Sequence, residues 1–188
     1  MGGAEVFSDN SSKHDMAERL WELEELALLD GLTRLSNRRH LDAELQSRIQ
    51  EVQRYGMSLG VLFMDIDDFK KINDRCGHAI GDLVLQTVAN TLALMGRPFD
   101  LFGRWGGEEF VGLIRNVNQD ALVKIGQRCR ALVEQSATAF KDDCDLRVTI
   151  SLGATLCRPD DTLDSLMDRA DRLMYEGKRQ GKNRLVVG

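Results

Sequence analysis

Several classes of protein are excluded by what this sequence has little of. No apolar run is longer than residues 59–64, far short of a membrane-spanning segment, and no secretion signal is visible. Basic residues are outnumbered, since 25 Lys and Arg face 30 Asp and Glu, for a formal charge of −5. This balance argues against broad nucleic-acid binding, which usually needs a basic face. We therefore expect a cytoplasmic domain, although the full-length protein could be anchored in a membrane.

The four cysteines include no CxxC pair and no other spacing typical of a zinc site. They are Cys76, Cys129, Cys144 and Cys157. In a cytoplasmic protein such cysteines are usually reduced core or surface residues, and we expect the same here.

The composition fits one globular domain with a short appendage. With 188 residues, 43% of them hydrophobic, the chain can build a full core. Residues 1–13 are small and polar, so we expect them to be disordered or left over from cloning. Residues 14–30 have apolar side chains at heptad spacing and predict a signalling or linker helix, which either packs on its own domain or ends a dimeric stalk. Residues 31–188 make up the main domain.

Strand-like and helix-like segments alternate along this domain. Strands are predicted at residues 59–65, 100–105, 110–114, 146–156 and 184–187. Helices are predicted from the 31–39 segment to about 54 and at about 80–95, 120–135 and 163–179, with a short helical turn from 69. The helix at 80–95 is expected to turn these side chains inward: Leu83, Val84, Val88, Leu92 and Met95. Because the two central strands form a hairpin, the predicted α/β (α+β) fold has a mixed sheet.

The most informative motif is the run Gly106-Gly107-Glu108-Glu109-Phe110, between two of the predicted strands. A Gly-Gly pair there suits a two-residue hairpin turn in which both central residues have positive φ. With no side chain in the way, a bulky anion can approach the backbone, and Glu108 at the edge of the turn can hold a divalent cation beside it. The motif predicts a metal-dependent site for a nucleoside triphosphate. The alternative is an ordinary hairpin with solvated acids.

A second acidic cluster ends the buried strand at 59–65. Asp65 is the last residue of that strand, a common place for a ligand-binding group. Asp67 and Asp68 precede a helical turn and suit N-cap positions. If the strand pairs with the hairpin, Asp65 and Glu108 lie on adjacent strands. Two carboxylates, phosphate oxygens and a backbone carbonyl form the oxygen-rich shell that Mg²⁺ prefers.

Over about residues 30–187, the chain resembles a GGDEF-type diguanylate cyclase domain, in the variant spelled GGEEF. Five blocks carry the resemblance, in this order: DGLTRLSNRR (30–39), MDIDDFKKINDRCGHAIGD (64–82), RWGGEEF (104–110), SLGAT (151–155) and ADRLMYEGKRQGKNRL (170–185). The resemblance implies a five-stranded mixed sheet flanked by helices, related to polymerase palms and nucleotidyl cyclases. It also implies an enzyme that condenses two GTP molecules into cyclic di-GMP and releases two pyrophosphates.

The resemblance implies a role for each acidic residue of the two clusters. Asp65, Glu108 and the backbone carbonyl of Ile66 are expected to bind Mg²⁺, or Mn²⁺ in its place. Glu108 is also the expected base for the attacking 3′-hydroxyl. Glu109 is a weaker catalytic candidate, because its side chain should point to the face opposite its neighbour's. Lys70 is expected to stabilise charge on the phosphates.

The same resemblance implies the residues that bind GTP. Asn73 and Asp82 match the guanine readers, since a carboxylate can accept from guanine N1–H and N2–H₂ whereas adenine has no donor at N1. Asp82 has helix capping as its alternative role. His78 is expected to contact the nucleotide, and its alternative role is loop packing. The other expected contacts are the amides of Asp68 and Phe69, the glycines Gly106 and Gly107, and the pair Lys178 and Lys182.

Lys178 and Lys182 are four residues apart, and so lie on one helical face if the last helix continues. They match the family's two basic phosphate contacts, of which the second is usually arginine. Lysine keeps the charge but loses the bidentate fork. Lysine in place of arginine at residue 182 therefore leaves open a weaker binding of the triphosphate, but it does not imply a loss of activity.

The run Arg97-Pro98-Phe99-Asp100 matches the RxxD of the family's product-inhibition site by its offset from the GGEEF motif. The Arg97 guanidinium can pair with phosphate or stack on guanine, and Asp100 can accept from a guanine edge. The resemblance thus implies feedback inhibition by cyclic di-GMP, with Arg128 as a second contact.

One domain offers one GTP site, whereas the product needs two GTP molecules that face each other. Catalysis is therefore expected in an antiparallel homodimer, controlled by the 14–30 helix and by an upstream sensory domain absent from this chain. Two alternatives are a non-catalytic module that senses cyclic di-GMP or GTP, and another nucleotidyl cyclase. The retained glycines and acids argue against the first, and Asn73 with Asp82 argues against the second.

Overall fold

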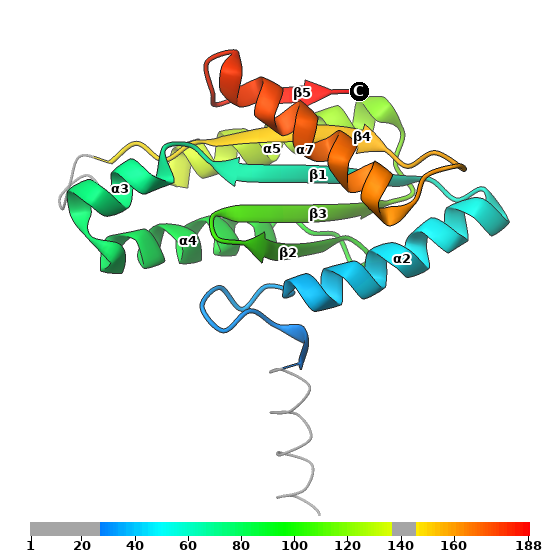
Figure 1. Cartoon of the computed structure of the whole chain (residues 1–188), viewed down its shortest axis with the longest axis horizontal. Coiled ribbons are helices and arrows are strands. Elements are labelled where there is room, and N and C mark those ends of the chain that lie inside the picture. Colours follow the sequence, from blue (N-terminus) through cyan, green and yellow to red (C-terminus); the bar gives the residue numbers. More distant parts are fainter. Residues whose placement is uncertain (1–26, 137–145) are drawn as a thin grey trace, which may run out of the picture.

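A computed structural model describes residues 27–136 and 146–188 and shows a five-stranded sheet with helices on both faces (Figure 1). The strands are β1 (Leu59–Ile66), β2 (Leu101–Gly106), β3 (Glu109–Arg115), β4 (Ile150–Leu156) and β5 (Leu185–Val187). The helices are α2 (Arg38–Tyr55), α3 (Phe69–Cys76), α4 (His78–Ala93), α5 (Gln119–Ser136) and α7 (Leu163–Arg179). The order in the sheet is β2-β3-β1-β4-β5. Only β4 and β5 pair in parallel, so the predicted mixed sheet is confirmed.

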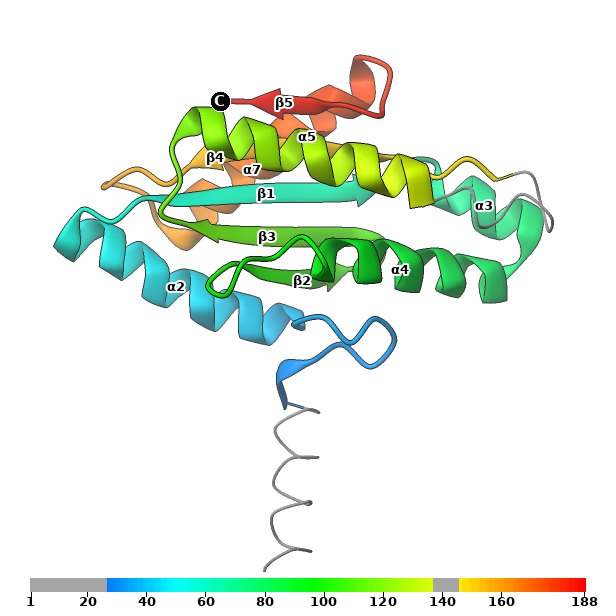
Figure 2. The same cartoon turned by 180° about the vertical axis from the view of Figure 1, so that it is seen from behind.

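Two helical layers cover the sheet. Helices α2 and α7 lie over one face (Figure 1), and α4 and α5 lie over the other (Figure 2). The central strand β1 is buried along its whole length, so its alternate side chains enter two separate cores. Leu62 and Met64 pack with the α4–α5 layer, whereas Val61 and Phe63 pack with α2 and α7.

Helix α7 lies directly on the backbone of β4 at Gly153. A Cβ atom there would be 2.0 Å from the carbonyl oxygen of Ala170 and 2.5 Å from the amide nitrogen of Met174. Both are backbone atoms of α7, so no side chain fits between the helix and the strand. This close approach gives a physical reason for the glycine in the SLGAT block.

Several predicted boundaries agree with the structure, and others need correction. Helix α7 has the predicted bounds, and its first turn has a capping box in which Thr162 and Ser165 exchange hydrogen bonds. The strand predicted from residue 146 begins only at Ile150, and α3 is an eight-residue helix rather than a single turn. The inward orientation of Leu83 was wrong, because its side chain is 47% exposed beside the buried Val84.

The predictions for residues 1–13 and for most of the 14–30 helix lie outside the described residues. The described part of that helix ends at Leu28, and Leu29 forms a β-bridge with Ser36. Cys129 and Cys157 have free thiols, as expected, but Cys76 forms a disulfide bond, which corrects the expectation of reduced cysteines. No helix in the described ranges combines the length and the apolar character needed to cross a bilayer.

We predict that Gly153→Ala lowers the free energy of unfolding by about 3 kcal/mol or more, because the new methyl group overlaps rigid backbone atoms of α7. Urea denaturation followed by far-UV circular dichroism measures this change. Gly31→Ala is the matched control, since a Cβ there has no heavy atom within 4 Å. Equal stability of the two variants would show that α7 does not rest on β4 as described.

Candidate active site

The GGEEF motif forms the hairpin between β2 and β3, with a turn one residue later than predicted. Strand β2 ends at Gly106 and β3 begins at Glu109, so Gly107 and Glu108 are the two turn residues. Of the two glycines only Gly107 has positive φ, at 44°. The register shifts between Arg104 and Gly106, which accounts for the displaced turn. A Cβ on Gly107 would meet nothing within 4 Å, so the backbone is open to a ligand, as expected.

Arg104 holds this turn against the segment that precedes α2. Its guanidinium donates from Nε (2.9 Å) and Nη2 (2.7 Å) to the carbonyl oxygen of Gly107, and from Nη1 to Asp30 Oδ1 at 3.2 Å. Asp30 is fixed in turn by the amide and hydroxyl of Thr33. Sequence reasoning missed Arg104 and Asp30 as supports of the turn, although both lie within the blocks that carry the resemblance.

Asp65 lies beside this turn, as predicted from the end of the buried strand. It is opposite Glu109 in the β1–β3 register, and the amide of Ile66 donates to the carbonyl oxygen of Glu108 at 3.3 Å. The side chain is buried, and Nζ of Lys178 lies 2.6 Å from its Oδ1. No other donor among the described residues reaches that oxygen. Burial raises the pKa of Asp65 to about 6, against the lowering effect of Lys178.

Glu109 shares a face of the sheet with Asp65, because directly opposed residues of an antiparallel pair point the same way. Its side chain lines a cavity of about 450 Å³ with Arg38 and Asp171, under α2 and α7. Burial and the charge of Asp171 raise its pKa. The weaker catalytic role expected for Glu109 stays a prediction.

A divalent cation fits this place only together with a ligand. Within residues 27–136 and 146–188, no three His, Cys, Asp or Glu side chains are grouped closely enough to hold a metal by themselves. Glu108 lies near Asp65, because the amide of Ile66, the next residue, donates to the Glu108 carbonyl oxygen. Lys178 is the one described residue that contacts Oδ1 of Asp65, and phosphate oxygens could supply the missing ligands.

The turn between β1 and α3 provides backbone donors for an anion. Asp68 is the N-cap residue of α3 with φ of 55°, and its side chain makes no capping hydrogen bond. The next amides, from Phe69 on, have no acceptor within the helix and can bind phosphate oxygens. Lys70 is exposed on the first turn. The geometry is therefore compatible with the phosphate contacts predicted for Asp68, Phe69 and Lys70.

Asp68 holds the predicted N-cap position of α3, but neither Asp67 nor Asp68 caps the helix through its side chain, which corrects that part of the prediction. Asp67 is buried, and its carboxylate accepts from the hydroxyls of Thr149 (2.7 Å) and Ser151 (2.6 Å) and from the amide of Asn183 (2.9 Å). Asp68 instead forms ion pairs through both its oxygens. Asp67 thus fixes the segment before β5 to the sheet, a role that sequence reasoning missed.

Lys178, in the last turn of α7, and Lys182, beyond its end, reach neighbouring carboxylates. Helix α7 ends at Arg179, so the predicted continuous helical face is wrong. Gly181, Lys182 and Asn183 have φ of 120°, 63° and 47°, which turns the chain back toward β5. Nζ of Lys182 lies 2.7 Å from Oδ2 of Asp68, next to the contact of Lys178 with β1.

The predicted guanine-binding residues lie where α3 and α4 meet. Asn73 is in α3, and a Cβ on Gly81 of α4 would be 1.9 Å from its Oδ1. His78 and Asp82 are exposed on the first turns of α4. None of these three polar side chains has a hydrogen-bond partner in the described part of the chain, so all three are available to a ligand.

The predicted inhibitory site lies at the start of β2, at the end opposite the GGEEF turn. Asp100 accepts from the amides of Arg97 (3.2 Å) and Arg115 (3.3 Å), which orders the short loop before the strand. The Arg97 side chain is exposed, as is that of Arg128 on α5. No contact recorded among the described residues joins the two arginines.

Comparisons with known proteins agree with this arrangement. A family model described as "Diguanylate cyclase, GGDEF domain" matches residues 27–184. Diguanylate cyclase DgcZ of Escherichia coli K12 is 36% identical over 158 residues, which cover 84% of this chain and 52% of DgcZ. Response regulator PleD of Caulobacter vibrioides is 40% identical over 164 residues, which cover 86% of this chain and 36% of PleD. The chain thus spans about half the length of these curated relatives, or less.

Solved structures give the same result. The coiled coil and GGDEF domain of DgcB from Caulobacter crescentus, in complex with c-di-GMP, is 28% identical with a TM-score of 0.89 and 98% coverage of both chains. The active GGEEF domain of a diguanylate cyclase from Vibrio cholerae is 27% identical with a TM-score of 0.72, covering 81% of this chain and 97% of that one. Because the family model matches most of its residues, the chain belongs to the GGDEF family of diguanylate cyclase domains.

Proposed function

We propose that this chain is the catalytic domain of a diguanylate cyclase, which condenses two GTP molecules into cyclic di-GMP and two pyrophosphates. The observation that carries the proposal is the meeting of Asp65 with the GGEEF turn, next to two lysines that reach into the same place. Acidic metal ligands, basic phosphate contacts and backbone amides are the groups that a phosphoryl-transfer site needs.

In each of two equivalent steps, the 3′-hydroxyl oxygen of one GTP forms a bond to the α-phosphorus of the other. The bond from that phosphorus to the α–β bridging oxygen breaks, and pyrophosphate leaves with the electron pair. The hydroxyl proton passes to Glu108 or to solvent. Mg²⁺ or Mn²⁺, held by Asp65, Glu108 and the carbonyl of Ile66, would lower the pKa of the hydroxyl and offset phosphate charge.

The remaining residues position the substrate. Lys178, Lys182 and the first amides of α3 hold the phosphates, and Lys70 offsets charge as the bond breaks. Asn73 and Asp82 bind the guanine edge at the α3–α4 junction, where no described residue pairs with their polar groups. A nucleobase without donors at that edge would leave the Asp82 carboxylate unpaired, which favours guanine.

Catalysis requires two copies of the chain, because each domain has one GTP site and the product joins two nucleotides. We propose an antiparallel homodimer in the cytoplasm, whose pairing is controlled through the N-terminal segment by an upstream sensory domain. The link between Asp30 and Arg104 supports this proposal, since it joins that segment to the GGEEF turn.

Product inhibition is a further part of the proposal. The exposed guanidinium of Arg97 and the fixed carboxylate of Asp100 offer a phosphate contact and a guanine contact in one loop. Arg128 adds a second cation from α5. Cyclic di-GMP bound there would act at a distance from the reaction centre, at the other end of β2.

We predict that Glu108→Gln lowers the rate of cyclic di-GMP formation at least about a hundredfold, because it removes both a metal-ligand charge and the proposed base. The assay incubates the protein with GTP and Mg²⁺ and separates the products by chromatography. Glu176→Gln, an exposed substitution on α7, is the matched control. An unchanged rate in Glu108→Gln with a native melting curve would contradict the site.

The same assay tests the proposed activity itself. Tight binding of GTP by the wild-type protein without turnover would indicate a sensing module instead of an enzyme. A cyclic mononucleotide product would indicate a different nucleotidyl cyclase.

We also predict that Arg97→Ala weakens inhibition by cyclic di-GMP by about tenfold or more, because it removes a charged contact. The concentration that halves the initial rate is measured for each variant against its own uninhibited rate. Arg172→Ala, an exposed arginine of α7, serves as the control. Equal inhibition constants for wild type and Arg97→Ala would remove the proposed inhibitory site.

A further inference from the structure

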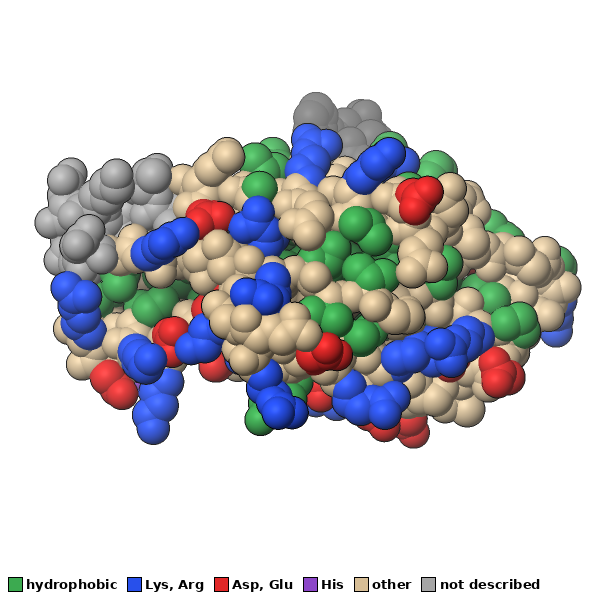
Figure 3. All heavy atoms as spheres, turned by 90° about the horizontal axis from the view of Figure 1, so that it is seen from above, with side chains coloured by type: hydrophobic (Ala, Val, Ile, Leu, Met, Phe, Trp, Pro, Cys, Tyr) green, Lys and Arg blue, Asp and Glu red, His purple; other side chains and the backbone are tan. Residues whose placement is uncertain are grey.

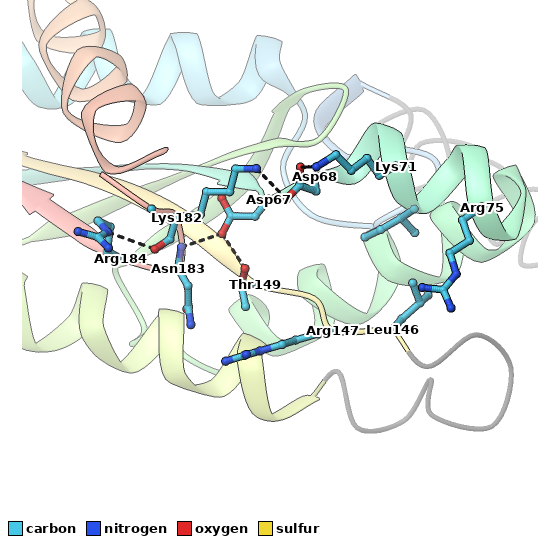
Figure 4. A pocket seen from close by; sticks show the side chains of 12 residues that line it. Asp67, Asp68, Lys71, Arg75, Leu146, Arg147, Thr149, Lys182, Asn183 and Arg184 are labelled. Carbon is cyan, nitrogen blue, oxygen red and sulfur yellow. Dashed lines mark hydrogen bonds and ion pairs between the residues drawn. The ribbon is translucent and has the colours of Figure 1, made fainter. Parts of the chain in front are cut away.

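A large cavity opens beside the proposed phosphate site, between α3, the segment before β4 and the loop before β5 (Figure 4). Its volume is about 710 Å³. We name it the basic cavity after the five cationic side chains that line it: Lys71, Arg75, Arg147, Lys182 and Arg184. Such a concentration of positive charge stands out in a chain whose formal net charge is −5.

The two acidic side chains in the basic cavity, Asp67 and Asp68, are already engaged. Asp67 is buried and holds two hydroxyls and the amide of Asn183. Asp68 binds Lys71 through Oδ1 at 2.8 Å and Lys182 through Oδ2 at 2.7 Å. Asp67 and Asp68 offset two of the five positive charges, and Glu134 offsets one more through Arg147, so the described lining keeps an excess of positive charge.

Three arginines, Arg75, Arg147 and Arg184, line the basic cavity, and their positive charges are not fully paired. Arg75 on α3 has no ion-pair or hydrogen-bond partner among the described residues. Arg147 contacts Glu134 at the rim, and its side chain is 76% exposed. Among the described residues, Arg184 donates to neutral oxygens alone, the carbonyl of Lys182 and the side chain of Gln180. Figure 4 shows the three side chains coming from three different segments.

Lys182 belongs both to the lining of the basic cavity and to the proposed phosphate site. This residue lines the cavity and contacts Asp68, while Lys178, four residues earlier, contacts Asp65. The loop that carries Lys182 is fixed, because Asp67 accepts a hydrogen bond from the amide of Asn183, the next residue. Both Lys182 and Asn183 have positive φ. The cations of the basic cavity therefore begin at Lys182, a residue that the proposed phosphate site already uses.

We propose that the basic cavity receives pyrophosphate as it leaves the reaction centre, with Arg75, Arg147 and Arg184 as its further ligands. This inference rests on the proposed function, which generates one pyrophosphate for each bond formed. A multiply charged anion needs several cations at once, and planar guanidinium groups bind phosphate oxygens in a bidentate way that lysine cannot. The arginines of the basic cavity thus supply the bidentate phosphate contact that Lys182 cannot make.

The test is isothermal titration of pyrophosphate into the full chain without divalent metal. We expect the double variant Arg75→Ala with Arg147→Ala to weaken pyrophosphate binding by at least about tenfold, since two charged contacts are lost. Arg54→Ala is the matched control, because it removes an arginine from the last turn of α2, at the opposite end of the molecule (Figure 1). Arg75→Gln with Arg147→Gln replaces the alanine variant if that variant melts early.

A parallel titration uses a GTP analogue whose α–β bridge cannot be cleaved. We expect its affinity to fall less than threefold in the same double variant, because its phosphates stay at Lys178, Lys182 and the α3 amides. An equal loss for the analogue and for pyrophosphate would overturn the proposal and make the cavity part of the triphosphate site. Unchanged pyrophosphate affinity in the double variant would also overturn it.

Inorganic phosphate, titrated in the same way, separates a pyrophosphate site from a general anion site. We expect phosphate to bind at least about tenfold more weakly than pyrophosphate, because it can engage fewer of the cations at once. Equal affinities would overturn the assignment to the leaving group. Failure of the proposed function is distinguishable, since it appears as an absence of cyclic di-GMP in the wild-type assay while pyrophosphate still binds.

Discussion

The contact between Lys178 and Asp65 is the interaction on which the rest of the site depends. A carboxylate at the buried end of β1 is costly to keep ionised, as the raised pKa of Asp65 shows, and the lysine offsets part of that cost. The lysine reaches Asp65 only because α7 lies directly on β4. That position depends in turn on Gly153, where two backbone segments meet with no side chain between them. The close packing at Gly153 of β4 thereby places the positive charge of Lys178 beside Asp65 at the end of β1.

Asp67 has a comparable role for the phosphate side of the site. Its carboxylate joins the end of β1, strand β4 and the loop before β5 through three hydrogen bonds. This buried group is fully satisfied, so it specifies one arrangement of the loop without an unpaired charge. The consequence is that Lys182, in a backbone conformation that is uncommon for a residue with a side chain, lies where an anion can bind.

Much of the fold could be predicted from local sequence patterns. The apolar run of β1 and the sequence pattern of α7 predicted their positions within one residue, and the GGEEF motif located the hairpin. The turn itself was misplaced, because a register shift near Trp105 has no local signature. The face of Leu83 was wrong for a related reason: one residue at the edge of an apolar stripe can point either way.

The parts of the site that sequence could not predict are contacts between distant segments. The four-residue spacing of Lys178 and Lys182 suggested a shared helix, whereas their common location comes from the reversal of the chain after Arg179. Asp67 fits a capping position in the sequence, but its partners are Thr149, Ser151 and the amide of Asn183. Arg104 and Asp30 are 74 residues apart, and a pair at that separation leaves no periodic signal in the sequence. Charge and spacing find candidate ligands, but tertiary structure decides which of them meet.

The bridge from Asp30 through Arg104 to the carbonyl oxygen of Gly107 has a thermodynamic consequence. Because one guanidinium binds both the segment at Asp30 and the turn at Gly107, the motions of these two segments are correlated. If a nucleotide bound at the tip restricts it, reciprocity of coupled equilibria requires that ordering of the entry segment tighten nucleotide binding by the same factor. Arg104 would then couple ordering of the segment at Asp30 to nucleotide binding at the GGEEF turn, in both directions.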